Sequence, residues 1–238
     1  MKYFIINYTF NPKVRGCQNG TIKDYKYYGN IYDPKFIGRI NFEKVDFDPI
    51  PVSPILYSKA KKTDLIDKGG QLSHRIVVST KLKMILEKND FGVQYFQNSI
   101  IHRNIEDFQY WVINPFENKN KWIDINNSSI YFRKFNPEKI ENFKILNLSP
   151  IEFKSLLEVK NIFDEIYYYQ LSLFEEMIDR DFFTLQTTIQ GVSYIVSENL
   201  KQEIEEADCT GIEFQPIELS YQEWTAPGGE RERVYGKM

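Results

Sequence analysis

The residues that could carry out chemistry are few in this chain and lie far apart. His74 and His102 are its two histidines, and neither has the spacing of a metal site, in which two histidines lie four residues apart with a glutamate between them. Cys17 and Cys209 are its two cysteines, and no histidine lies near Cys209 in the sequence to activate a thiol nucleophile. The sequence therefore predicts neither a metal site nor a disulfide framework.

Short glycine and carboxylate motifs predict no active site either. Gly69-Gly70 and Gly228-Gly229 lack the Gly-Lys-Ser/Thr ending of a phosphate-binding loop, so we interpret both as turns. Glu175-Glu176 and Glu205-Glu206 are adjacent carboxylates, but adjacent residues on a helix point in different directions and do not form an acid/base couple by spacing alone. The sequence also has no Gly-x-Ser-x-Gly motif. We expect a protein that is not an enzyme and has no cofactor.

An internal repeat is the most informative feature of the sequence. Residues 76–100 and 194–219 each contain a β-branched run, a serine, a helical stretch, a glycine and a second strand. A repeat reveals the structural unit, and two copies rarely hold the same active site, so we expect the shared residues to serve the architecture. With one residue inserted before the glycine, the identical positions are Val78/Val196, Ser79/Ser197, Leu82/Leu200, Lys83/Lys201, Glu87/Glu205 and Gly92/Gly211.

Each copy predicts a strand–helix–strand unit. About fourteen residues separate its two strands, which is enough for a parallel crossover. The glycine after each helix suits a backbone with positive φ. In the last strand of the 194–219 copy, alternation predicts that Ile212 and Phe214 point inward and that Glu213 and Gln215 point outward.

Three serines are predicted to cap helices. Ser79 and Ser197 follow the first strand of each copy and should accept a hydrogen bond from a backbone N–H in the first helical turn. Ser149 precedes a proline, and Glu152 follows three residues later, which is the pattern of a capping box. We expect this third helix over about 150–160, with further helix to about 178. Tyr167-Tyr168-Tyr169 is a candidate stacking platform, but its helical spacing favours packing into the core.

Composition and charge limit the class of protein. The 238 residues are 42% hydrophobic and 16% aromatic, enough for a sizeable core, and no apolar run approaches the roughly 20 residues needed to span a membrane. The net charge of −3 gives no general argument for a nucleic-acid partner. Residues 1–150 carry 23 Lys+Arg and 15 Asp+Glu, whereas residues 151–238 carry 7 and 18. The acidic end is therefore a candidate surface for a basic partner; alternatively its helices are simply solvated, or the two halves attract each other.

These patterns predict an α+β fold. It should have mixed sheets, two related strand–helix–strand units and two closely packed lobes. We place an N-terminal β-rich lobe at residues 1–145, with the 76–100 unit, and a C-terminal lobe of helices and strands at 146–238, with the 194–219 unit. The tail after residue 220 contains Pro227-Gly228-Gly229 and mixed charge, so its end is expected to be mobile.

Several short stretches of the sequence carry a family resemblance. The clearest part is the Val196-Ser197-Glu198 and Thr210-Gly211-Ile212-Glu213-Phe214 block. The other stretches are Thr63-Asp64-Leu65-Ile66, Ile76-Val77-Val78-Ser79, Tyr110-Trp111-Val112-Ile113-Asn114 and Phe182-Phe183-Thr184-Leu185. By these stretches, residues 55–219 resemble a large family of bacterial immunity proteins from polymorphic toxin systems, whereas residues 1–50 and the tail after 220 match no motif.

The resemblance implies a non-enzymatic protein of the cytoplasm that binds and neutralises a cognate toxin domain in competition between bacteria. If that toxin has a cationic cleft, an acidic face would speed association. The candidate contacts are Glu198, Glu203, Glu205, Glu206 and Asp208 in the second repeat, with Trp224 as an aromatic anchor. Two alternatives remain: an enzyme with a cleft between the repeat units, or a nucleic-acid or sugar-binding module in the basic, Tyr-rich first half.

Overall fold

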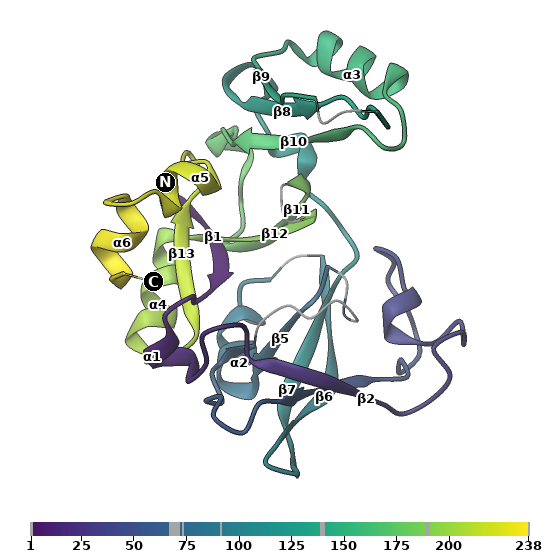
Figure 1. The fold of residues 1–238 in the computed structure, drawn as a ribbon, viewed down its shortest axis with the longest axis vertical. Coiled ribbons are helices and arrows are strands. Elements are labelled where there is room, and N and C mark those ends of the chain that lie inside the picture. The colour runs from purple at the N-terminus through teal and green to yellow at the C-terminus, as the bar shows by residue number, and fades with distance from the viewer. Residues whose placement is uncertain are drawn as a thin grey trace.

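The chain forms an α+β fold with two mixed sheets (Figure 1). The computed structural model describes residues 2–66, 72, 74–90, 92–138, 141–188 and 191–237. The predicted turn at Gly69-Gly70 lies outside these residues. The predicted α+β class with mixed sheets is confirmed, because each sheet joins parallel and antiparallel neighbours.

The seven-stranded sheet combines both ends of the chain. Its order is β13 (Ile212–Pro216), β1 (Tyr3–Tyr8), β12 (Gly191–Ser197), β11 (Phe182–Thr188), β10 (Glu165–Gln170), β8 (Ser129–Arg133) and β9 (Lys144–Leu146). The lobe boundary near residue 145 stays a prediction. The sheets divide the chain in another way, since the N-terminal strand β1 and strand β8 both lie beside strands from the C-terminal half.

The six-stranded sheet comes from the first half of the chain. Its order is β2 (Ile22–Tyr27), β3 (Val52–Leu56), β6 (Val93–His102), β7 (Ile105–Pro115), β5 (Ile76–Ser79) and β4 (Leu65–Ile66). The α-helices are α1 (Pro12–Arg15), α2 (Thr80–Leu86), α3 (Pro150–Val159), α4 (Glu198–Glu206), α5 (Tyr221–Thr225) and α6 (Glu230–Tyr235).

Both repeat segments form a strand, a helix and a second strand. In each unit the two strands run parallel, and an antiparallel strand lies between them. Strand β7 separates β5 from β6, and β1 separates β12 from β13. The part of the chain that precedes each unit adds a fourth strand to it. Strand β4 lies beside β5, and strand β11 lies beside β12.

The intervening strands β7 and β1 occupy equivalent places. Tyr110 lies opposite Ser79, and Tyr3 lies opposite Ser197. This register aligns residues 110–114 (Tyr-Trp-Val-Ile-Asn) with residues 3–7 (Tyr-Phe-Ile-Ile-Asn). The sequence analysis found no motif in the N-terminal segment, because β1 comes before its unit in the chain whereas β7 lies after β5 and β6.

All three predicted serine caps are confirmed. The Ser79 side chain accepts a hydrogen bond from Leu82 N, and the Ser197 side chain accepts one from Leu200 N. Ser149 forms the predicted capping box with Glu152. Gly92 and Gly211 have the predicted positive φ, 75° and 86°, but they do not end the repeat helices. Helices α2 and α4 end at Leu86 and Glu206, and the two glycines lie in the turns before β6 and β13.

The shared lysine of the two units has a common environment. Lys83 lies over the rings of Tyr95 and Trp111 and pairs with the glutamate one helical turn later. Lys201 lies over the rings of Phe4 and Phe214 and pairs in the same way with Glu205. The ammonium group is attracted by both rings and the carboxylate, so the identical residues hold each helix against its sheet.

The two units pack against each other through one core. Helix α2 contacts helix α4, and strands from both sheets contribute apolar side chains between them. A second core lies beneath α3 and unites it with the seven-stranded sheet. The buried residues shared between the units include Phe4, Ile76, Val78, Leu82, Phe182, Tyr194, Val196, Leu200 and Ile204.

Two sequence-based expectations about strands are wrong. The helix expected to reach residue 178 ends at Val159, and residues 165–170 form strand β10, whose buried Tyr168 alternates with the partly exposed Tyr167 and Tyr169. Glu213 and Gln215, expected to point outward, are both buried. Tertiary packing overrode the alternation argument, because α5 and α6 of the tail cover that side of β13 (Figure 1).

Candidate interaction surfaces

Helix α4 carries the acidic residues that the sequence analysis proposed as partner contacts. Two of them form ion pairs within the chain. Glu203 pairs with Lys88 at 2.9 Å, and Glu205 pairs with Lys201 at 3.7 Å. The charge of this face is therefore partly neutralised, and the Lys88–Glu203 pair joins the two repeat units.

The other acidic candidates lie at the two ends of α4. Glu198 is in the first turn, where a negative charge suits the helix dipole. Glu206 and Asp208 are exposed at the opposite end. The backbone oxygen of Asp208 accepts a hydrogen bond from Lys81 Nζ at 2.8 Å. Glu206 and the Asp208 carboxylate thus contribute exposed charge to the predicted face.

Trp224, the predicted aromatic anchor, is fully buried. Trp224 is 0% exposed, and the centroid of its ring lies 6.0 Å from that of the Tyr221 ring in α5. In this structure the indole is part of the core and is not presented to a partner. Neither its residue type nor its place in a polar tail distinguishes these two roles in the sequence.

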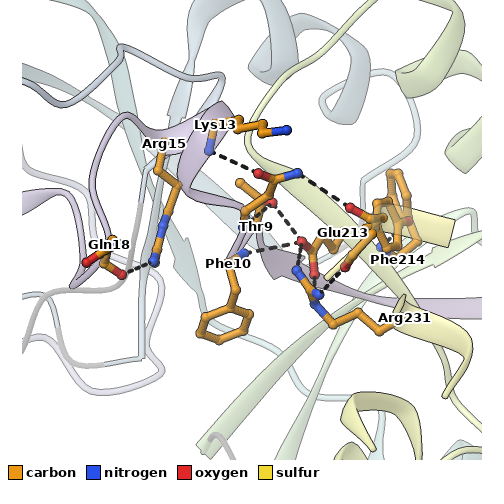
Figure 2. Close-up of polar contacts among 11 residues, drawn as sticks. Thr9, Phe10, Lys13, Arg15, Gln18, Glu213, Phe214 and Arg231 are labelled. Atoms are coloured by element: carbon orange, nitrogen blue, oxygen red, sulfur yellow. Dashed lines mark hydrogen bonds and ion pairs between the residues drawn. The ribbon is translucent and has the colours of Figure 1, made fainter. Parts of the chain in front are cut away.

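A buried carboxylate attaches the C-terminal tail to the second unit (Figure 2). Glu213 on β13 has 0% exposure and accepts two hydrogen bonds from the Arg231 guanidinium of α6, at 2.7 and 2.8 Å. Thr9 Oγ1 and Phe10 N donate to the same carboxylate at 2.6 and 3.2 Å. All four hydrogen bonds to this carboxylate come from groups within the chain, so we interpret the Glu213–Arg231 ion pair as structural.

The geometry of the two histidines gives no support to the enzyme alternative. His74 is buried with its ring stacked on Phe42 at 4.1 Å, whereas His102 lies at the end of β6 near the Ser58 carbonyl. Burial, with help from Asp64, raises the pKa of the Cys209 thiol to about 11, so the thiol is protonated at neutral pH. Within the described ranges, no group of three or more His, Cys, Asp and Glu side chains could hold a metal ion.

The basic, Tyr-rich first half has part of its charge paired locally. Lys26 lies over the ring of Tyr28 at 4.5 Å and also pairs with Glu106. Lys62 pairs with Asp107. The exposed tyrosines of this half include Tyr27, Tyr28, Tyr32 and Tyr57.

An aromatic surface that the sequence analysis missed lies at the far end of the seven-stranded sheet. Tyr131 on β8 lies opposite Ile145 on β9 and Tyr167 on β10, so these three side chains share one face. The Tyr131 ring stacks on Tyr167 at 4.3 Å and on Phe143 at 5.0 Å. We refer to Tyr131, Phe143, Ile145 and Tyr167 as the outer aromatic face.

The two faces of the sheet differ in their cover at this end. Helix α3 covers the opposite face, where Phe153 contacts Tyr168. On the outer aromatic face, Phe143 is 48% exposed and Ile145 is 40% exposed. Figure 1 shows β8, β9, β10 and α3 together at the top of the molecule, away from the six-stranded sheet. The Tyr-Tyr-Tyr motif was the only sequence signal, and interpreting it as helical concealed the face.

A cavity of about 280 Å³ adjoins this face. It lies where β8 ends and β10 begins, beside the ion pair between Arg133 and Glu165. Phe135 and Phe163, with ring centroids 5.1 Å apart, form its apolar side. Polar and charged side chains make up the rest of its lining, namely those of Arg133, Lys134, Asn136, Glu141 and Glu165.

A family model described as "Immunity protein family (Imm11)" matches residues 7–219, and no curated protein matches the sequence. The matched range includes both repeat units and the outer aromatic face, and it ends before α5. Among the residues described, no helix has both the length and the apolar character needed to cross a membrane.

Proposed function

The chain belongs to the Imm11 immunity protein family, and from this premise we propose that it binds a cognate toxin domain in the cytoplasm and neutralises it. The family match over residues 7–219 is the observation that carries the proposal. An interaction role also agrees with the partly exposed aromatic rings on the seven-stranded sheet, because large exposed apolar groups are typical of interaction surfaces.

The mechanism that we propose is stoichiometric binding that blocks the toxin. Neither histidine lines the cavity beside Phe135 and Phe163, and the Cys209 thiol is protonated at neutral pH. These observations favour binding over chemical modification of the toxin. A toxin encoded next to its immunity protein would meet it at once, so affinity and association rate determine protection.

The test is co-production of the protein with the toxic domain encoded beside it. We expect a stable complex on size exclusion and full rescue of growth. Neutralisation without a complex, at protein amounts far below those of the toxin, would show that the protein acts catalytically and would overturn the proposal.

The acidic residues of α4 remain the sequence-based proposal for electrostatic steering. Reversing Glu203, Glu205 and Glu206 to lysine should slow association with a cationic toxin, most strongly at low salt. Because Glu203 and Glu205 already pair with lysines of this chain, stability must be measured in parallel. A single Glu206→Lys variant leaves both ion pairs intact and isolates the steering effect; unchanged association rates at low salt would remove this face.

A further inference from the structure

The outer aromatic face is built as a preorganised contact surface. Its Tyr131 and Tyr167 rings lie almost parallel, with 9° between their planes, and the Phe143 ring lies 19° from that of Tyr131. Tyr131 is only 5% exposed because its two neighbours cover it. Rings that already support one another lose little conformational freedom when a partner covers them.

Strand β9 offers a backbone edge next to this face. It is the last strand in the sheet order, and among the strands that the structure describes only β8 pairs with it. An extended segment from another protein can add to such an edge by main-chain hydrogen bonds. Short edge strands with a lysine usually resist this, and Lys144 is such a lysine, but here the neighbouring Phe143 and Ile145 are apolar and partly exposed.

The lysine on β9 favours one kind of partner segment at this edge over another. Lys144 on β9 is exposed and forms no ion pair with the residues described, and its partner Phe132 places it on the face opposite Tyr131. An added strand presents alternate side chains to the two faces, so apolar residues that cover the outer aromatic face alternate with residues that lie beside Lys144. Carboxylates at those alternate positions would neutralise this lysine, whereas a second copy of this chain would bring another lysine to the same edge.

We propose that an extended segment of the toxin domain, with apolar side chains alternating with carboxylates, adds to β9 and covers the outer aromatic face. One of its apolar side chains enters the cavity between Phe135 and Phe163. The Arg133–Glu165 pair that lines that cavity provides polar contacts. This inference rests on the proposed function and names its contact surface.

The experiment measures binding of single variants to the toxic domain encoded beside this chain, produced in an inactive form. Phe143→Glu and Ile145→Glu should each raise Kd by roughly tenfold or more, as expected for central apolar contacts. Phe108→Glu is the matched control, because Phe108 is 57% exposed on β7 of the other sheet. Its Kd should stay within about twofold of the wild-type value. Thermal unfolding of each free variant shows whether its fold is intact.

Hydrogen exchange in the wild-type complex provides a readout that does not depend on any substitution. Amides of residues 144–146 should exchange more slowly in the complex than in the free protein. Unchanged exchange there, together with wild-type affinity of both the Phe143→Glu and the Ile145→Glu variant, would overturn the inference while leaving the proposed function intact. Failure of the wild-type protein to bind would overturn both. A dimer of the free protein that Ile145→Glu dissociates would assign the face to a second copy and overturn it too.

Discussion

Removing Arg231 tests whether one buried ion pair attaches the tail to the second unit. Glu213 has 0% exposure, and Arg231 supplies two of its four hydrogen bonds. In Arg231→Ala the carboxylate keeps only Thr9 Oγ1 and Phe10 N as donors. Breaking one side of a buried pair typically costs about 3–5 kcal/mol, because the remaining charge stays buried without its partner.

The expected result is a fall of roughly 10 °C in the thermal midpoint, since 1 kcal/mol corresponds to about 2–4 °C for a chain of this size. Opening of α5 and α6 would let water reach Glu213 and limit the loss. That opening would expose the fully buried Trp224, which a red shift in tryptophan fluorescence detects. Urea unfolding at pH 7 measures the free energy directly.

A double-mutant cycle separates the ion pair from the packing of the arginine stem. Glu213→Gln and the double variant with Arg231→Ala complete the cycle, and the coupling energy should exceed about 1.5 kcal/mol. Arg233→Ala on the same helix is the matched control, because Arg233 is exposed and should change stability by less than about 0.5 kcal/mol. Equal, small losses for Arg231→Ala and Arg233→Ala would refute the reasoning.

Three further predictions concern the joint between the two units. Ser79→Ala and Ser197→Ala should each lower stability by about 1 kcal/mol, because each removes a helix cap and a hydrogen bond to an aspartate that precedes the unit, Asp64 or Asp181. Unchanged thermal midpoints would contradict the role of these serines as caps. Burial favours a raised pKa for Asp64, but hydrogen bonds from Ser79, Thr210 and Lys81 outweigh it and hold the pKa below its usual value. The stability that Asp64 contributes is therefore present above the usual aspartate pKa of about 4, and it is lost as the pH falls through the lower pKa of the folded state. In urea unfolding, the free-energy advantage of the wild-type protein over Asp64→Asn should therefore shrink in acid. Gly211→Ala should destabilise the protein strongly, since the φ of Gly211 is 86° and a Cβ would lie 2.7 Å from the Leu65 carbonyl oxygen. Gly228→Ala is the control, because Gly228 has a φ of 72° but a Cβ there meets no atom within 4 Å. Equal losses of unfolding free energy in urea for the two variants would show that φ alone matters.

The reciprocal contacts of these joints could not have been found from the sequence. Leu65 N donates to Thr210 O, and Phe182 N donates to Asn89 O, so the turn of each unit receives the opening strand of the other. These partners are separated by about a hundred residues or more in the chain. Periodicity and capping signals act over a few residues and say nothing about which distant turn a strand will meet.

Local rules determined the parts that the sequence predicted correctly. A serine cap needs only the backbone N–H three residues later. The caps at Ser79, Ser149 and Ser197 and the positive φ at Gly92 and Gly211 follow from such short-range geometry.

Tertiary structure alone decided which faces are covered. Glu213 alternates with apolar residues like any outward side chain, yet α6 covers it and Arg231 neutralises it. Tyr167 belongs to a tyrosine run like the buried Tyr168, yet its strand neighbours place it on the uncovered face. A residue's environment depends on what packs against its element, and that is set by contacts between segments far apart in the chain, which no local pattern encodes.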